Sequence, residues 1–146
     1  MAVNSNKVIS GGKADGLTKR LTTARTGLAT IASPADAADL RLLFTAGSNG
    51  GFVDEIGYNI VGTGTQLASL IYIWRTDASG ANAEIVNRFI VAAGSAMSGT
   101  VPGQTDVLLP IYENLAAGQK LFASIHILSA NCEAVVWACG GQFEAQ

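Results

Sequence analysis

The residues that could do chemistry are few and far apart in this chain of 146 residues. One histidine, His126, and two cysteines, Cys132 and Cys139, cannot form a histidine-rich metal site and are one ligand short of a zinc cluster. Spacing does not exclude a Ser-His-Asp triad, but the Gly-x-Ser-x-Gly elbow is missing. Gly47–Gly51 and Gly62–Gly64 lack the Gly-Lys-Ser/Thr that holds phosphate. We therefore expect no enzyme, no catalytic or metal-binding residues and no cofactor.

Two further groups of side chains have both a functional and a structural interpretation. Asp54 and Glu55 would point to opposite faces of a strand, which is wrong for a catalytic pair. Because Asp54 then shares a mostly apolar face with Ile56, we expect it to pair with an arginine. Four aromatic residues could stack on sugar rings, but aromatic residues more often belong to a core: Tyr58, Tyr72, Trp74 and Trp137.

The elements that must position these residues are short strands, and the clearest lie between Leu67 and Val91. Leu70–Arg75 and Glu84–Val91 are rich in β-branched and aromatic residues, and they flank the turn-forming segment Thr76–Asn82. This pattern predicts a β-hairpin with a loop longer than two residues. Neither face of Leu70–Arg75 is polar, so one face should fill a core and the other should meet a loop or a neighbouring subunit.

Further strands are predicted at intervals separated by turns. Alternation and β-forming residues mark Leu40–Thr45, Phe52–Val61, Thr105–Leu109 (ended by Pro110), Leu121–Ile127 and Glu133–Cys139. No convincing long helix accompanies them, and the 17 glycines fall mostly at connections. We therefore predict an all-β fold, an antiparallel β-sandwich that resembles a jelly roll, with an extended N-terminal arm.

The composition favours a protein that associates with others. Only 14% of the residues are charged, 49% are hydrophobic and the mean hydropathy is +0.32, so some surface should be covered by partners. The alternative is a monomer with a polar, weakly charged surface. No signal peptide or membrane span is predicted. Cys132 and Cys139 would be about 23 Å apart on one strand, so we expect two reduced thiols.

The charge is distributed unevenly along the chain. Residues 1–30 carry five basic residues and one acid, net +4, whereas residues 31–146 carry four basic residues and ten acids, net −6. The basic residues are too dilute for nucleic acid, so we expect an arm, residues 1–33, that reaches an acidic protein surface from a sandwich domain, residues 34–146. The basic residues of this arm are Lys7, Lys13, Lys19, Arg20 and Arg25.

From Leu43 onward the chain resembles a class of small structural proteins of tailed bacteriophages. The similar stretches are LFTAGSNGGFVDEIGYNIVGT (Leu43–Thr63), LIYIWR (Leu70–Arg75), NLAAGQKLFASIH (Asn114–His126) and EAVVWACGGQFE (Glu133–Glu144). They cover about the last two-thirds of the chain, whereas residues 1–33 match no pattern of the class. The resemblance implies a non-enzymatic β-sandwich, a head-decoration (cement) or tail-associated protein, commonly a trimer.

Together these observations predict a capsid decoration protein that is made in the host cytoplasm and located on the capsid surface. The basic arm would bind the major capsid protein, and outward apolar residues would form the trimer interface: Ile71, Ile73 and Phe122. Neither nucleic acid nor a membrane is an expected partner. Deletion of residues 1–33 should leave a folded trimer that no longer binds capsids. The alternative is a tail-fibre or virion-surface domain that recognises host glycans through Tyr72 and Trp74.

Overall fold

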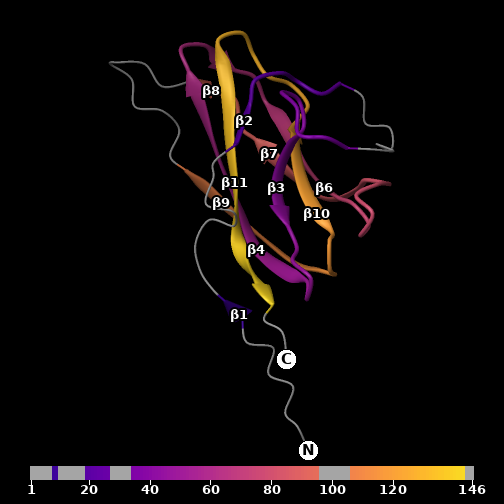
Figure 1. The fold of residues 1–146 in the computed structure, drawn as a ribbon. Helices are drawn as coiled ribbons and strands as arrows, with labels where there is room; N and C mark the ends of the chain where they lie inside the picture. The colour runs from indigo at the N-terminus through magenta and orange to yellow at the C-terminus, as the bar shows by residue number, and fades with distance from the viewer. Residues whose placement is uncertain (1–7, 10–18, 27–33, 96–105, 144–146) are drawn as a thin grey trace, which may run out of the picture.

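The computed structural model describes residues 8–9, 19–26, 34–95 and 106–143, and these residues form two facing β-sheets (Figure 1). The first, the β11 sheet, contains β1 (Val8–Ile9), β2 (Lys19–Leu21), β4 (Gly51–Gly62), β9 (Val107–Leu115) and β11 (Cys132–Phe143). The second, the β10 sheet, contains β3 (Arg41–Thr45), β6 (Ser69–Arg75), β7 (Glu84–Val91) and β10 (Lys120–Ile125). A small ladder joins β5 (Thr65–Gln66) to β8 (Gly94–Ser95).

The strand order is that of a jelly roll. β1 and β2 pair with successive stretches of β11, so the β11 sheet runs β2-β11-β4-β9 and the β10 sheet runs β3-β10-β6-β7. Every pairing is antiparallel, and the chain passes repeatedly from one sheet to the other, as in two Greek keys. The predicted antiparallel, jelly-roll-like β-sandwich is therefore confirmed.

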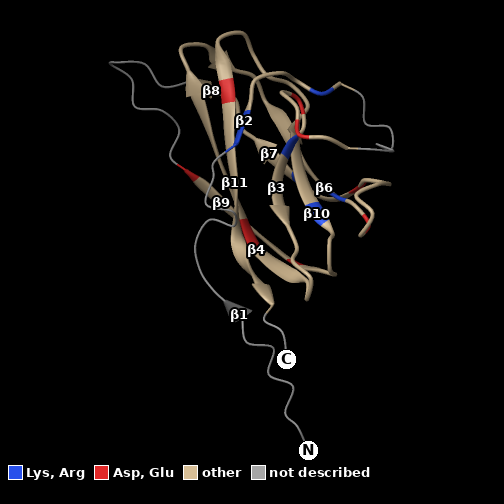
Figure 2. Ribbon diagram, in the orientation of Figure 1, with Lys and Arg blue, Asp and Glu red and all other residues tan. Residues whose placement is uncertain are grey.

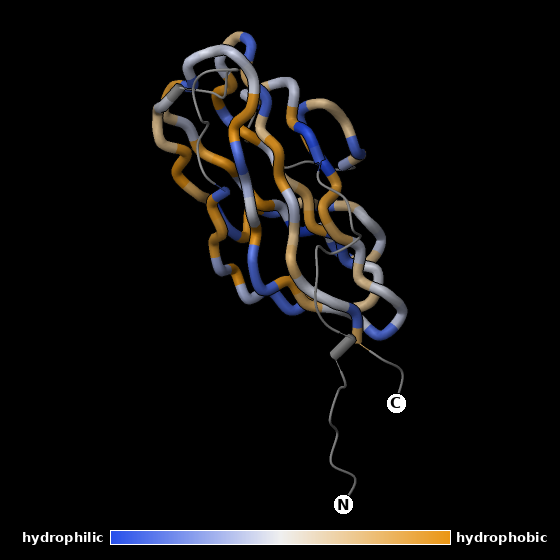
Figure 3. The backbone as a smooth tube through the Cα atoms, turned by 90° about the vertical axis from the view of Figure 1, so that its left-hand side faces the viewer, coloured by the Kyte–Doolittle hydropathy of each residue, from blue (hydrophilic) through white to orange (hydrophobic). Residues whose placement is uncertain are grey.

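The main core fills the space between the two sheets. Large side chains from both layers meet there and are almost completely buried, among them Phe44, Ile56, Ile73 and Leu121. Hydrophobic stretches run along the strands of both sheets (Figure 3), and β6 and β10 are buried at nearly every position. Burial of so much apolar surface is the main force that holds the two layers together.

A second, smaller apolar cluster covers the outer face of the β10 sheet. Tyr72 and Trp74 of β6 and Phe122 of β10 are buried there beneath Leu40 and Ala83. The Trp74 indole N–H donates a 2.8 Å hydrogen bond to the Ser124 hydroxyl oxygen, which satisfies both buried groups. The two-faced apolar pattern of β6 is thus explained by a core on one side and by connecting segments on the other.

The predicted hairpin is confirmed, and its loop is organised by one carboxylate. β6 and β7 pair antiparallel. One carboxylate oxygen of Asp77 accepts hydrogen bonds from the Ser79 hydroxyl, at 2.5 Å, and the Ala81 N–H, at 3.0 Å. The other accepts from the Asn82 amide at 3.2 Å. These bonds, with Ser79 the largest contributor, lower the pKa of Asp77 below its ordinary value of 3.8.

Replacement of Asp77 by asparagine should destabilise the protein at neutral pH and have no such effect in acid. A group whose pKa is lowered by folding contributes stability above its unfolded pKa, and that contribution is lost as the pH falls through the folded value. Urea unfolding of the wild type and of Asp77→Asn should therefore give different midpoints at pH 7 that converge well below pH 3.8. A difference that persists in acid would show that the ionised carboxylate is not responsible.

Two strand predictions need correction. β9 does not end at Pro110 but continues to Leu115, which is possible because β9 is an edge strand, where proline is tolerated. The alternation predicted for β4 fails at Asp54, which has no partner on β11 because the register shifts there. As a result Val53 and Ile56 both face the core, while Asp54 is exposed and does not need the expected arginine.

Candidate assembly surfaces

Each sheet has two outer edges, and an unprotected edge can pair with a strand of another molecule. On β9 the edge is interrupted by Pro110, which has no N–H, and by Tyr112, whose φ of 51° places it in the left-handed region. On the other side of the same sheet, β1 and β2 cover parts of β11. Within the described residues, the chain itself thus occupies or disrupts both edges of the β11 sheet.

The edges of the β10 sheet are protected by side chains. A register shift leaves Val86 of β7 without a partner on β6. Next to it, the Arg88 N–H donates to the Asn87 side-chain oxygen at 2.8 Å, and the Ile90 carbonyl accepts a 3.2 Å bond from the Tyr58 hydroxyl. At the opposite edge, the Leu42 N–H of β3 donates to an Asp36 carboxylate oxygen at 3.1 Å. These contacts disfavour the addition of a further strand.

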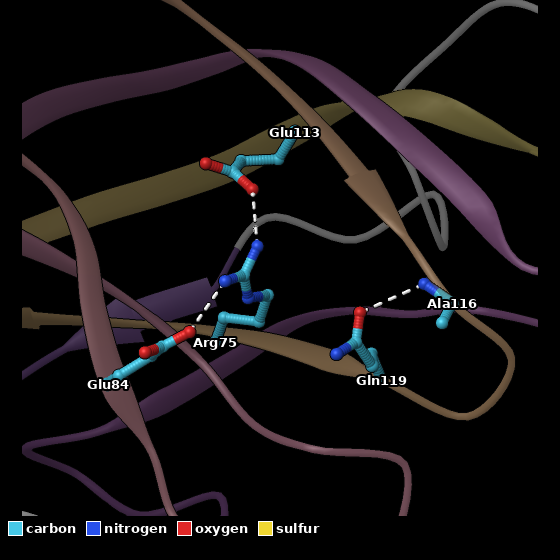
Figure 4. Close-up of polar contacts among 5 residues, drawn as sticks. All are labelled: Arg75, Glu84, Glu113, Ala116 and Gln119. Atoms are coloured by element: carbon cyan, nitrogen blue, oxygen red, sulfur yellow. Dashed lines mark hydrogen bonds and ion pairs between the residues drawn. The ribbon is translucent and has the colours of Figure 1, made fainter.

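The strands β7 and β9 end the two sheets on the same side of the sandwich, and Arg75 connects them. Its guanidinium donates to a Glu84 oxygen of β7 at 2.6 Å and to a Glu113 oxygen of β9 at 3.1 Å (Figure 4). The hydrogen bond with Glu84 is the main cause of the raised pKa of Arg75, and burial opposes it. We call this side of the molecule the β7–β9 side.

Exposed apolar side chains lie on both strands of the β7–β9 side. Ile90 is 76% exposed, Tyr112 75% and Leu108 53%, and Ile85 is also exposed. A hollow of about 410 Å³ on β7 is lined by residues 85–88. Figure 2 shows how sparse the charged residues are over the described strands. Apolar side chains this exposed are the kind of surface that a partner covers.

The basic residues predicted to dock on a partner are, where the structure describes them, paired within the chain. Arg20 contacts Glu133 at 2.7 Å, Arg25 contacts Asp39 at 2.7 Å and Lys19 lies 3.9 Å from Asp36. Lys7 and Lys13 lie outside the described residues. Leu21 of β2 is fully buried in the main core. Residues 19–21 are therefore part of the sandwich rather than of an extended arm.

The three residues predicted to form the trimer interface lie inside the molecule. Ile71 and Ile73 are fully buried in the main core, and Phe122 is buried in the second cluster. They offer no surface to a neighbouring subunit, so their predicted outward orientation is wrong. The alternation of β10 predicted that Phe122 faces outward. Its side chain does lie on the outer face of the β10 sheet, but the second cluster covers that face.

The aromatic residues considered for sugar stacking are also buried. Tyr58, Tyr72, Trp74 and Trp137 are each almost inaccessible to solvent. The ring of Trp137 lies so close to Gly57 that a β-carbon at this glycine would overlap it. The structure therefore provides no exposed stacking platform at these four positions.

The titratable residues singled out in the sequence do not come together as a site. His126 is half-buried, and its ring lies edge-on to Tyr72 with centroids 6.4 Å apart. No disulfide joins Cys132 to Cys139, and within the described ranges no three His, Cys, Asp or Glu side chains are grouped to hold a metal ion. In the part of the chain that the structure describes, no helix is long and apolar enough to cross a membrane.

The sequence did not single out the exposed residues on β7 and β9. In β7 the register shifts against β6, so the alternation that separates inward from outward positions changes phase within the strand. β9 alternates throughout, but the predicted strand ended before Pro110, so Tyr112 fell outside it. Pro110 in a β-rich stretch was the one signal that could have marked β9 as an edge strand.

Comparison with known proteins does not identify a family for this chain. No protein-family model matches the chain, and no curated protein matches it. A solved structure titled "Structure of infectious bursal disease virus Gt strain" aligns with 96% of this chain at 16% sequence identity and a TM-score of 0.30. The aligned region is 35% of that chain, so this protein spans about a third of its length. At this TM-score the similarity carries no functional argument.

Proposed function

We propose that this protein is a non-enzymatic structural protein of a virion, a decoration protein that associates with itself and binds the major capsid protein. Its place would be the capsid surface, and its assembly would follow synthesis in the host cytoplasm. Among self-associated forms the proposal favours a trimer, which is the common state in the class that the sequence from Leu43 onward resembles.

The observation that carries this proposal is the set of exposed apolar side chains on β7 and β9, which lie on the outer faces of the β10 sheet and of the β11 sheet, respectively. Ile90, Leu108 and Tyr112 are each more than half exposed in a chain with only 14% charged residues. An isolated soluble protein gains nothing from large apolar side chains in water, whereas an assembly protein buries them against partners. The jelly roll is compatible with this role, since capsid proteins are among those that use it, although the fold by itself does not decide the function.

The structure changes how the protein would contact its partners. Because Ile71, Ile73 and Phe122 are buried, self-association is now assigned to the β7–β9 side. Because Lys19, Arg20 and Arg25 pair with acids of the same chain, contact with the capsid protein is assigned to Lys7 and Lys13. Their positive charge suits an acidic protein surface.

The role can be tested on virions produced by the genome that encodes this chain. Mass spectrometry of purified particles should find the protein in many copies, and immunogold labelling should place it on the head. Labelling of the tail alone would overturn the capsid assignment, and absence of the protein from purified particles would overturn a virion role altogether.

Aspartate substitutions on the β7–β9 side should reduce self-association without unfolding the protein. Ile90→Asp and Leu108→Asp replace exposed side chains, so their cost to folding should stay within about 0.5 kcal/mol, but a charge there must be desolvated in an interface. Multi-angle light scattering should show a multimeric wild type and lower masses for these variants. Leu67→Asp is the matched control, because Leu67 is 60% exposed but lies outside β7 and β9. A monomeric wild type, or equal masses for all variants, would contradict the assignment.

A further inference from the structure

The segment Lys19–Arg25, here called the latch segment, is attached to the body by a specific set of contacts. Its first three residues form β2, which pairs with residues 134–136 of β11, and the Leu21 side chain is fully buried in the core. Beyond β2, the N–H groups of Thr22 and Thr23 donate to the Ala38 carbonyl at 3.0 and 3.3 Å. The Arg25 N–H donates to the Ile125 carbonyl at 2.8 Å. The body therefore contains a site shaped for this particular sequence.

The ionic contacts of the latch segment are partly exposed to water. The side chains of Lys19 and Arg25 are 25% and 24% accessible and that of Arg20 is 63% accessible, and their acidic partners are similarly exposed. Ion pairs of this kind are individually weak and are screened by salt. The latch segment is thus held by a site of high specificity whose charged contacts can be weakened without unfolding the sandwich.

We propose that the latch segment is exchangeable between copies, so that the latch segment of one molecule occupies the β11 site of another. A second copy carries the same residues and therefore fits the site in every contact, which is the condition for domain swapping. Asp36 follows Arg25 by eleven positions, and this length of chain can span up to about 36–40 Å. That reach is sufficient to enter a neighbouring molecule in contact with the first.

Exchange of the latch segment is the favoured route for backbone pairing between copies, because the other sheet edges are disrupted. The edge of β9 is interrupted by Pro110 and Tyr112, and that of β7 by a register shift and by side-chain hydrogen bonds. In contrast, β11 pairs in regular register with β2, which comes from a distant part of the chain. Exchange would join copies whether or not the protein belongs to a virion, so this inference is independent of the proposed function.

Disulfide trapping between two different variants tests the exchange directly. Arg20 and Val135 are register partners, and opposed residues of antiparallel strands are about 4.5–5.5 Å apart at Cα, within disulfide range. Arg20→Cys and Val135→Cys are made in separate chains, each with Cys132→Ala and Cys139→Ser. The two proteins are mixed, incubated in about 1 M NaCl, where the Debye length is about 3 Å, returned to low salt, and oxidised. Covalent dimers are then measured on a non-reducing gel.

Exchange predicts a covalent heterodimer of the two variants. Paired strands hold the thiols at an effective concentration of about millimolar, so the yield should exceed that of a collision control by at least about tenfold. The heterodimer should also form faster when the two variants are incubated in about 1 M NaCl than when they are incubated in low salt. The control mixes Arg20→Cys with Glu84→Cys, because the Glu84 side chain is 62% accessible, like that of Arg20, but lies on β7. A heterodimer yield equal to that of the control at both salt concentrations would overturn the proposal.

One further variant checks the register in the absence of exchange. A single chain that carries both Arg20→Cys and Val135→Cys should form an internal disulfide as a dilute monomer, because β2 pairs with β11. Failure to form this bond, while circular dichroism shows a folded β protein, would mean that the latch segment does not occupy the β11 site, and the proposal would be overturned at its first step.

Discussion

Replacement of Leu21 by alanine is expected to destabilise the protein by about 2–5 kcal/mol, the usual cost of truncating a buried leucine. The sequence around Leu21 is that of a polar, basic terminal segment, so a substitution there would be expected to have no effect if the segment were an arm. In the structure Leu21 is fully buried in the main core and β2 is paired with β11. The free energy of unfolding from urea titration measures the difference.

Thr23→Ala is the matched control, because Thr23 is exposed two residues further along and such a change should stay within about 0.5 kcal/mol. Equal stabilities for wild type, Leu21→Ala and Thr23→Ala would show that Leu21 is not part of the core. The burial of Leu21 also changes the expected result of deleting residues 1–33. The truncated sandwich would lose a core side chain and a covering strand, so loss of capsid binding could follow from unfolding, and point substitutions at Lys7 and Lys13 are the better test.

Replacement of Trp74 by alanine should cost about 3–5 kcal/mol, because it removes a large buried side chain and leaves a cavity. Trp74 lies beside Tyr72 and Phe122 in the second cluster, and its indole N–H bonds the buried Ser124 hydroxyl. An exposed glycan-binding tryptophan would give the opposite result, a stable protein that has lost binding. Thermal and urea unfolding distinguish the two outcomes.

A double-mutant cycle separates the hydrogen bond from the packing. Trp74→Phe retains much of the apolar contact but leaves the Ser124 hydroxyl buried without its donor, which should cost about 1–3 kcal/mol beyond the lost volume. Ser124→Ala should therefore be less damaging in the Trp74→Phe background than in the wild type. Strictly additive effects would show that the indole and the hydroxyl are not coupled.

The features predicted correctly from the sequence are those set by neighbouring residues. The β6–β7 hairpin was recognisable because its strands and its turn are contiguous and differ sharply in residue type. The strand-rich, helix-free pattern was sufficient to predict an antiparallel sandwich. These signals are local, and they do not depend on which strands later come together.

The predictions that failed depend on contacts between distant segments. Val53 and Ile56 both face the core because β4 shifts register against β11, a strand about eighty residues later. Phe122 is covered because Leu40 and Ala83 reach the outer face of the β10 sheet. Leu21 resembles any leucine in a polar segment until β11 provides its strand partner. Period-two alternation cannot show such contacts. It therefore gave a wrong orientation for the predicted interface residues and placed residues 19–21 in the arm rather than in the sandwich.

The pairing of β2 with β11 also has a consequence for the time course of folding. The Arg20–Glu133 contact joins residues 113 positions apart, and among the two main sheets only β6 and β7 pair as immediate neighbours in the chain. Such non-local topologies fold slowly, in milliseconds to seconds. During synthesis the hairpin can form early, whereas β2 cannot pair until β11 has left the ribosome. On a polysome, several nascent chains would then present unpartnered β2 segments close to newly completed β11 strands, so the order of synthesis itself would bring neighbouring copies into competition for the same site.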